Sequence, residues 1–184
     1  MKILPLVISP DPLLKEISKP VEKVDAKLQE LMNNMVQTMY HNRGIGLAAV
    51  QVGVLKRVLV MDLDYSLDDC CESSGCDVVH PQNSNPKFLV NPEIIQASDK
   101  YSSFDEGCLS FPGAISSVDR PKEVVIKYLD FDGNEREEKV TGIQAVCVQH
   151  EIDHLNGITF VDHISKLKRD RIITKMKKLA KKKF

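Results

Sequence analysis

The chain has 184 residues, of which 42% are hydrophobic and 28% are charged, and its net charge is −1. This is the composition of an ordinary soluble globular protein, and the length is that of one domain able to bury a core without disulfides. No apolar run approaches the roughly 20 residues that cross a bilayer, and the N-terminus lacks the apolar block of a signal peptide. We therefore predict one domain over 1–184 that acts in the cytoplasm without a membrane partner.

The cysteines and the charges are unevenly arranged. The five cysteines are odd in number and lack the regular spacing of a disulfide framework, so we expect free thiols or metal ligands. Residues 166–184 contain ten Lys or Arg and one Asp, a net charge of +9, so the other 165 residues sum to −10. We interpret this asymmetry as a basic, partner-facing end on an acidic body.

The first predicted element is a helix over residues 25–42. Its apolar residues recur at helical spacing, Asp25 is suited to the N-cap, and Gly44 follows the end. The next segment, 44–53, is rich in small residues, and we expect a loop there.

Two strands are predicted at 56–63 and 87–95, separated by the polar segment 64–86. That segment is poor in core-forming residues, which favours a mobile loop. It also holds residues that could imitate a zinc site, but no strand pair or tight-turn glycine frames them. These residues are Cys70, Cys71, Cys76 and His80.

The C-terminal half predicts a hairpin and a central helix. Residues 122–140 form two strand-like runs around Asp132-Gly133, which is a good hairpin turn. The helix over 141–157 has Thr141 as candidate N-cap, and its first half is apolar nearly all round. We therefore expect an α+β fold, in which mixed or antiparallel sheets pack around this helix.

A last amphipathic helix is predicted from Ser165 to the C-terminus, within the basic segment 165–184. The residues expected to face inward are Leu167, Ile172, Ile173, Met176 and Leu179.

The central helix carries the sequence HEIDH, residues 150–154. His150 and His154, four residues apart, lie on one helix face and can reach the same metal ion. Glu151 lies roughly 100° around the helix, where it can take a proton from a water molecule at that ion. Asp153 lies about 60° to the other side of His150, where it could orient a neighbouring group. The alternative is a pair of hydrogen-bonded core histidines.

The third ligand is not downstream at a recognised spacing. The extended motif with a third histidine would place that residue at Phe160, and no glutamate follows Glu151. Three ligands on one helix would span about 10 Å, so Cys147 is better interpreted as a core residue. Cys108, in EGCLS, is the better candidate because Gly107 before it lets the backbone approach closely.

Three segments together resemble the signature motifs of the peptide deformylase family. They are GIGLAAVQ (44–51), EGCLS (106–110) and QHEIDH (149–154), in the family's order and approximate spacing. The resemblance extends from the N-terminal helix to the C-terminal one. It implies a hydrolase that removes the formyl group from N-formylmethionine on new polypeptides and releases formate.

The resemblance also implies the site residues. Cys108, His150 and His154 would be the metal ligands, and Glu151 the general acid and base. Gln51 and the backbone N–H of Leu109 would stabilise the oxyanion, and Gly46 would bind the substrate backbone. Glu106 and Arg120 would meet the substrate's N-terminal region and backbone. The methionine pocket would be lined by Ile45, Phe104, Ile143, Val146 and Cys147.

The metal and the partners follow from the same reasoning. A thiolate with two imidazoles suits Zn²⁺ or Fe²⁺; the resemblance implies Fe²⁺ in the cell, with Zn²⁺ possible in preparations. The basic helix at 165–184 is either a solvated face or a ribosome contact, and no DNA partner is expected. Two alternatives remain: a zincin-type peptidase, and a non-catalytic ribosome-binding metal protein.

Overall fold

The computed structural model of the chain describes residues 2–66 and 81–182. The helices in these ranges are α1 (Ala26–His41), α2 (Gly142–Leu155) and α3 (Lys166–Lys182). The strands are β1 (Gly46–Ala48), β2 (Val58–Met61), β3 (Lys87–Ala97), β4 (Tyr101–Gly107), β5 (Ile115–Pro121), β6 (Glu123–Leu129) and β7 (Glu135–Thr141).

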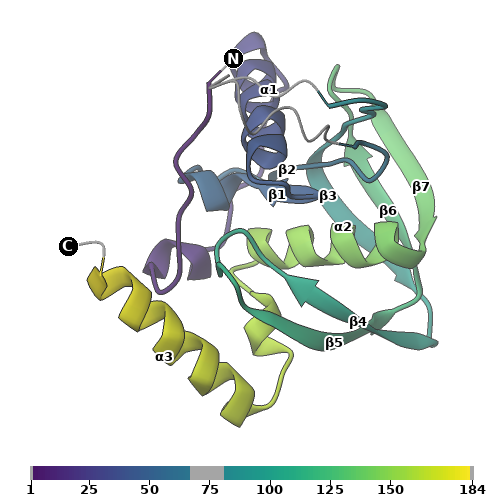
Figure 1. The fold of residues 1–184 in the computed structure, drawn as a ribbon. Coiled ribbons are helices and arrows are strands. Elements are labelled where there is room, and N and C mark those ends of the chain that lie inside the picture. The colour runs from purple at the N-terminus through teal and green to yellow at the C-terminus, as the bar shows by residue number, and fades with distance from the viewer. Residues whose placement is uncertain (1, 67–80, 183–184) are drawn as a thin grey trace.

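The strands form two antiparallel sheets around α2. The larger sheet has the order β1-β2-β3-β6-β7, and β4 pairs with β5 in a separate two-stranded sheet. Figure 1 shows α2 crossing the middle of the molecule, with β1–β3 on one side of it and β4–β5 on the other. The expected α+β fold, with sheets packed around the helix that carries HEIDH, is confirmed.

The N-terminal helix matches its prediction, but the segment after it does not. Asp25 caps α1 by accepting a hydrogen bond from the Leu28 N–H at 2.9 Å. Residues 44–53, predicted as a loop, contain β1 and a 3-10 turn at Ala49–Val52. Small residues hide the usual strand pattern here, and pairing with β2 decides the conformation.

Strands β4 and β5 were not predicted. Their exposed positions alternate with partly buried ones, but serines and charged residues occupy many of them, so hydrophobic alternation is weak. The predicted hairpin at 122–140 is confirmed as β6 and β7, and Gly133 occupies its turn with φ of +85°.

The two C-terminal helices occupy the predicted segments. Thr141 holds the N-cap position of α2 without a side-chain hydrogen bond to the helix. In α3, Met176 is buried, but Leu167 and Leu179 are exposed, so the inward orientation predicted for these two is wrong. The helix packs on the body through Met176, with Ile172 and Ile173 beside it, and Lys175 Nζ donates a hydrogen bond to the Gly113 carbonyl at 2.6 Å.

Two larger core clusters lie on either side of β1 and β2. One joins α1 to the sheet, and the other joins the sheet to α2.

Within residues 2–66 and 81–182, no helix combines the length and apolarity that a membrane crossing requires. The residues that could imitate a zinc site lie outside the described residues; they are Cys70, Cys71, Cys76 and His80.

Candidate metal centre

The described residues bring together three metal-ligating side chains. His150 and His154 project from one face of α2, 7% and 0% exposed, and Cys108 follows β4. The Cys108 Sγ lies 3.2 Å from His154 Nε2, and one ligand atom from each residue lies within 4.8 Å of the others. The separation of Cys108 Sγ from His154 Nε2 is close to an edge of a tetrahedral zinc site, and the residue types are those that hold one divalent ion.

Hydrogen bonding fixes which nitrogen His150 can offer to a metal. Its Nδ1–H donates to Glu106 Oε2 at 2.8 Å, which leaves Nε2 as the ligand atom. Glu106 is held in turn by Arg120, whose Nε and Nη2 donate to its two oxygens at 2.5 and 3.0 Å. Glu106 therefore orients His150, and a paired guanidinium keeps Glu106 ionised.

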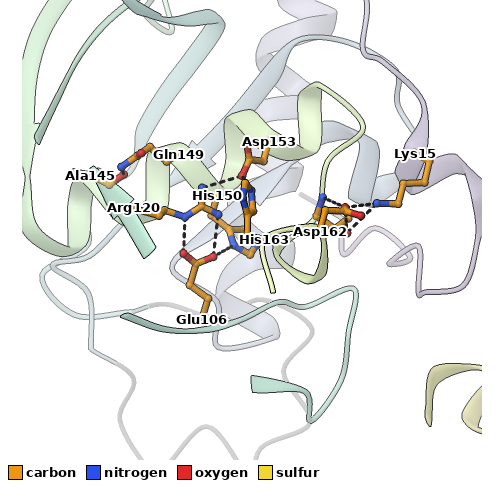
Figure 2. A network of polar contacts seen from close by, with 10 residues as sticks. Lys15, Glu106, Arg120, Ala145, Gln149, His150, Asp153, Asp162 and His163 are labelled. Atoms are coloured by element: carbon orange, nitrogen blue, oxygen red, sulfur yellow. Dashed lines mark hydrogen bonds and ion pairs between the residues drawn. The ribbon is translucent and has the colours of Figure 1, made fainter. Parts of the chain in front are cut away.

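The network continues from Arg120 to the surface (Figure 2). Arg120 Nη1 donates to Asp153 Oδ2 at 2.8 Å, and the same oxygen accepts from His163 Nε2 at 2.7 Å. Asp153 thus orients a neighbouring group, as its place in HEIDH predicted. His163, which follows α2, is thus a partner of Asp153.

This network predicts a pH dependence of stability. Burial raises the pKa of Glu106, but hydrogen bonds from His150 and Arg120 outweigh it and bring the pKa to about 2. A carboxyl whose folded pKa is depressed stabilises the fold above its unfolded pKa, and this contribution is lost as pH falls. Between about pH 5 and pH 2, the free energy of unfolding of the metal-free wild type is expected to fall by roughly 2–3 kcal/mol more than that of metal-free Glu106→Gln. Denaturant unfolding at a series of pH values measures this difference, and Glu137→Gln, at an exposed position, is the control.

Glu151 is buried beside the ligands with one free oxygen. Among the described residues, its Oε2 has no hydrogen-bond partner. Burial raises the pKa of Glu151 to about 7, so the group can accept and release a proton near neutral pH. A Cβ at Gly46 would lie 2.6 Å from Glu151 Oε1, so only glycine lets the β1 backbone approach this closely.

Gln51 faces the ligands with its amide nitrogen. Its Oε1 accepts from the Ala48 N–H at 2.8 Å, and its Nε2 lies 3.4 Å from Cys108 Sγ and 3.2 Å from Ser110 Oγ. The accepted bond fixes the amide orientation, so the donor end points into the site. Ser110, which the sequence did not suggest as functional, completes this arrangement.

The backbone of Leu109 offers a second donor. In the described part of the chain, no hydrogen bond uses its N–H. The residue directly follows Cys108, and both line the same cavity as Gln51 and Glu151.

The cavity beside the ligands has a volume of about 550 Å³. Of the predicted pocket residues, Val146 and Cys147 are buried in its wall, and Ile45 and Ile143 lie at its rim, 42% and 50% exposed. Further lining residues that sequence reasoning missed are Leu6, Phe111, Pro112, Ala114 and Ile115. The only signal for them in the sequence was the position of Phe111, Pro112, Ala114 and Ile115, which lie within five residues after EGCLS.

Two predicted substrate residues lie elsewhere. Phe104 is not in this cavity wall; it lines a smaller hollow with Lys122 and Thr141. Arg120 is 4% exposed and is occupied by Glu106 and Asp153 behind the ligands, so it does not line the cavity.

A Cys-His-His donor set, an adjacent buried carboxyl group and an open cavity are the combination typical of one class of protein, the mononuclear metallohydrolases. The particular family follows from comparison with known proteins. A family model described as polypeptide deformylase matches residues 3–170. The chain belongs to the polypeptide deformylase family, and it is an enzyme, a hydrolase that deformylates polypeptides.

Relatives and solved structures agree with this assignment. A peptide deformylase from Mesorhizobium japonicum is 48% identical over 181 residues, covering 98% of this chain and 95% of that protein. The crystal structure of the Ehrlichia chaffeensis enzyme with actinonin matches with a TM-score of 0.84 at 43% identity, covering 97% and 98% of the chains. A Met-Ala-Ser-bound structure from Acinetobacter baumannii matches at 0.75 and 35% identity, covering 88% and 98%.

Proposed function

We propose that the chain removes the formyl group from N-formylmethionine at the start of new polypeptides and releases formate. The observation that supports this most is the convergence of three ligand atoms within 4.8 Å of one another, beside the free oxygen of Glu151. A structural metal site would need neither a neighbouring base nor an open cavity. The alternative of a non-catalytic metal protein is wrong, since the chain belongs to a family of enzymes.

The ligands proposed are Cys108 Sγ and the Nε2 atoms of His150 and His154. A divalent ion bound there would act as a Lewis acid that lowers the pKa of water and polarises the formyl oxygen. One thiolate and two imidazoles suit either Fe²⁺ or Zn²⁺. Membership of the deformylase family favours Fe²⁺ in the cell, and Zn²⁺ can take its place in preparations.

Glu151 is proposed to carry the proton. In its ionised form it takes a proton from the attacking water, and it then gives that proton to the amine that leaves as formate is released. Its burial against Gly46 and its pKa of about 7 suit both halves of this cycle.

Gln51 and Leu109 are proposed to stabilise the negative charge that develops on the formyl oxygen. Gln51 Nε2 lies 3.4 Å from Cys108 Sγ, and Leu109 directly follows Cys108 in the wall of the same cavity. Fixed donors of this kind stabilise an oxyanion without reorganising during the reaction.

The methionine side chain is proposed to enter the cavity between β1 and α2. Ile45, Ile143, Val146 and Cys147 supply apolar contacts there. Gly46 is proposed to bind the substrate backbone, because it lines the same cavity. Glu106 acts on this reaction through His150, and Arg120 acts through Glu106. For Phe104, the proposed pocket role has no support from its position.

Formate release from a formyl-Met peptide tests this function. The iron form, prepared without oxygen, is expected to release formate and to leave the peptide bond of an unformylated peptide intact. Cleavage of the unformylated peptide would instead support the zincin-type peptidase.

The basic face of α3 is proposed to contact ribosomal RNA, where new chains emerge in the cytoplasm. Lys168, Arg171 and Lys178 are exposed on this helix, and clustered cations bind phosphate with strong salt dependence. Changing these three residues to Glu is expected to weaken ribosome co-sedimentation by more than about 10-fold at low salt. Formate release from a free peptide should change less than about twofold. Unchanged co-sedimentation would show that the basic face is only solvated.

A further inference from the structure

The segment Gly44–Gly46 forms one wall of the cavity and touches two residues of the proposed machinery. A Cβ at Gly44 would lie 2.8 Å from Leu109 Cδ1, and one at Gly46 would lie 2.6 Å from Glu151 Oε1. The wall is therefore packed without slack against both residues, so a small displacement of its backbone changes the shape of the cavity.

Only part of this wall belongs to the sheet. The ladder between β1 and β2 begins at Gly46, which pairs with Met61. The carbonyl groups of Gly44 and Ile45, before the ladder, accept hydrogen bonds from beyond β2. Ile45 O accepts from the Asp62 N–H at 3.0 Å, and Gly44 O accepts from the Tyr65 hydroxyl at 2.8 Å.

Tyr65 is itself held in place. Its ring contacts the ring of Tyr40 with centroids 4.6 Å apart, and the Tyr40 hydroxyl donates to Asp62 Oδ2 at 2.6 Å. Asp62 is 1% exposed, and its carboxylate also accepts from the backbone N–H groups of Asp64 and Asn85 at 2.9 and 2.7 Å. The Tyr65 hydroxyl is thus a fixed donor.

We infer that Tyr65 is a positioning residue for substrate binding: its hydroxyl fixes the Gly44 carbonyl and, through it, the cavity wall at Gly44–Gly46. This inference rests on the proposed function, because it concerns the same cavity. Tyr65 does not touch the reacting atoms. Its effect falls on how well the peptide fits, in the ground state and the transition state alike, and therefore on KM.

Tyr65→Phe tests this inference because it keeps the ring against Tyr40 and removes only the hydroxyl. KM for formyl-Met-Ala-Ser is expected to rise about 3- to 10-fold, the effect of one hydrogen bond, with kcat changed less than about twofold. The Kd of Met-Ala-Ser, which the Acinetobacter baumannii relative binds, should rise by a similar factor in calorimetry. Tyr101→Phe makes the same chemical change at a residue that is 60% exposed on β4, and it should change neither value.

The outcomes separate this inference from the function it rests on. If wild type releases no formate, the proposed function fails. The Kd of Met-Ala-Ser for wild type and for Tyr65→Phe still tests whether Tyr65 positions the cavity wall. If wild type is active and Tyr65→Phe keeps both the KM and the Met-Ala-Ser Kd, Tyr65 does not position the wall. A lower kcat with unchanged KM, together with a lower unfolding midpoint, would also overturn it, because that pattern is general destabilisation.

Discussion

Glu151→Gln is expected to lower kcat for formate release roughly 1000-fold, within the range that general acid–base groups contribute. The amide has nearly the shape of the carboxyl but cannot take a proton from water. Because Glu151 is not among the three ligands, metal content should remain that of wild type. Formate release and metal analysis on the same preparation give both results.

The control for this prediction is Glu137→Gln, which makes the same chemical change at an exposed position of β7 and should leave kcat unchanged. A Glu151→Gln variant that holds its full metal and keeps more than about a tenth of wild-type kcat would remove Glu151 from the proton-transfer role. Gly46 limits which other side chain could replace Glu151 as the proton carrier. The backbone of β1 packs directly on the carboxylate, so no other side chain can enter from that side.

Cys108→Ala is expected to weaken metal binding by more than about 100-fold, since removing even a residue that only orients a ligand costs 10- to 100-fold. Two histidines on one helix remain, and formate release should fall in proportion to the bound metal. Competition with a chelator measures the affinity. Unfolding of the metal-free proteins should show similar stability for variant and wild type, because Cys108 is only partly buried.

Cys147→Ala separates the two cysteines that the sequence offered as ligands. The Cys147 Sγ lies 3.5 Å from the Ile45 carbonyl and packs against Gly46, away from the ligand group. This variant should bind metal with wild-type affinity. Retention of metal by Cys108→Ala and its loss in Cys147→Ala would reverse the assignment.

Local sequence was sufficient for much of the site. His150, Glu151 and His154 could be placed relative to one another because a helix fixes the direction of residues four apart. Asp25 at the start of α1 and Gly133 in the hairpin turn were predictable for the same reason: each acts on neighbours within three or four residues.

Residues that depend on distant partners were harder to interpret. Arg120 was predicted to meet substrate, but it lies behind the ligands, because strand β5 presents it to Glu106 of the paired strand β4 and to Asp153 of α2. Leu167 and Leu179 lie on the predicted helix but outside its contact with the body. The periodicity of a sequence shows which face of a helix is apolar, but it does not show how much of that face the rest of the protein covers.

By itself, the sequence determined the α+β class, the helix that places His150, Glu151 and His154 close together, and the motifs that place the chain among the deformylases. Only the tertiary structure decided that Glu106 bonds His150 Nδ1, that the Gln51 amide is turned toward Cys108, and that the Tyr65 hydroxyl donates to the Gly44 carbonyl. Spacing along a helix is a property of the local chain. These contacts instead depend on strand register and on packing between distant segments. The paired residues are 21, 44 and 57 positions apart in the sequence, so no local pattern encodes the contacts.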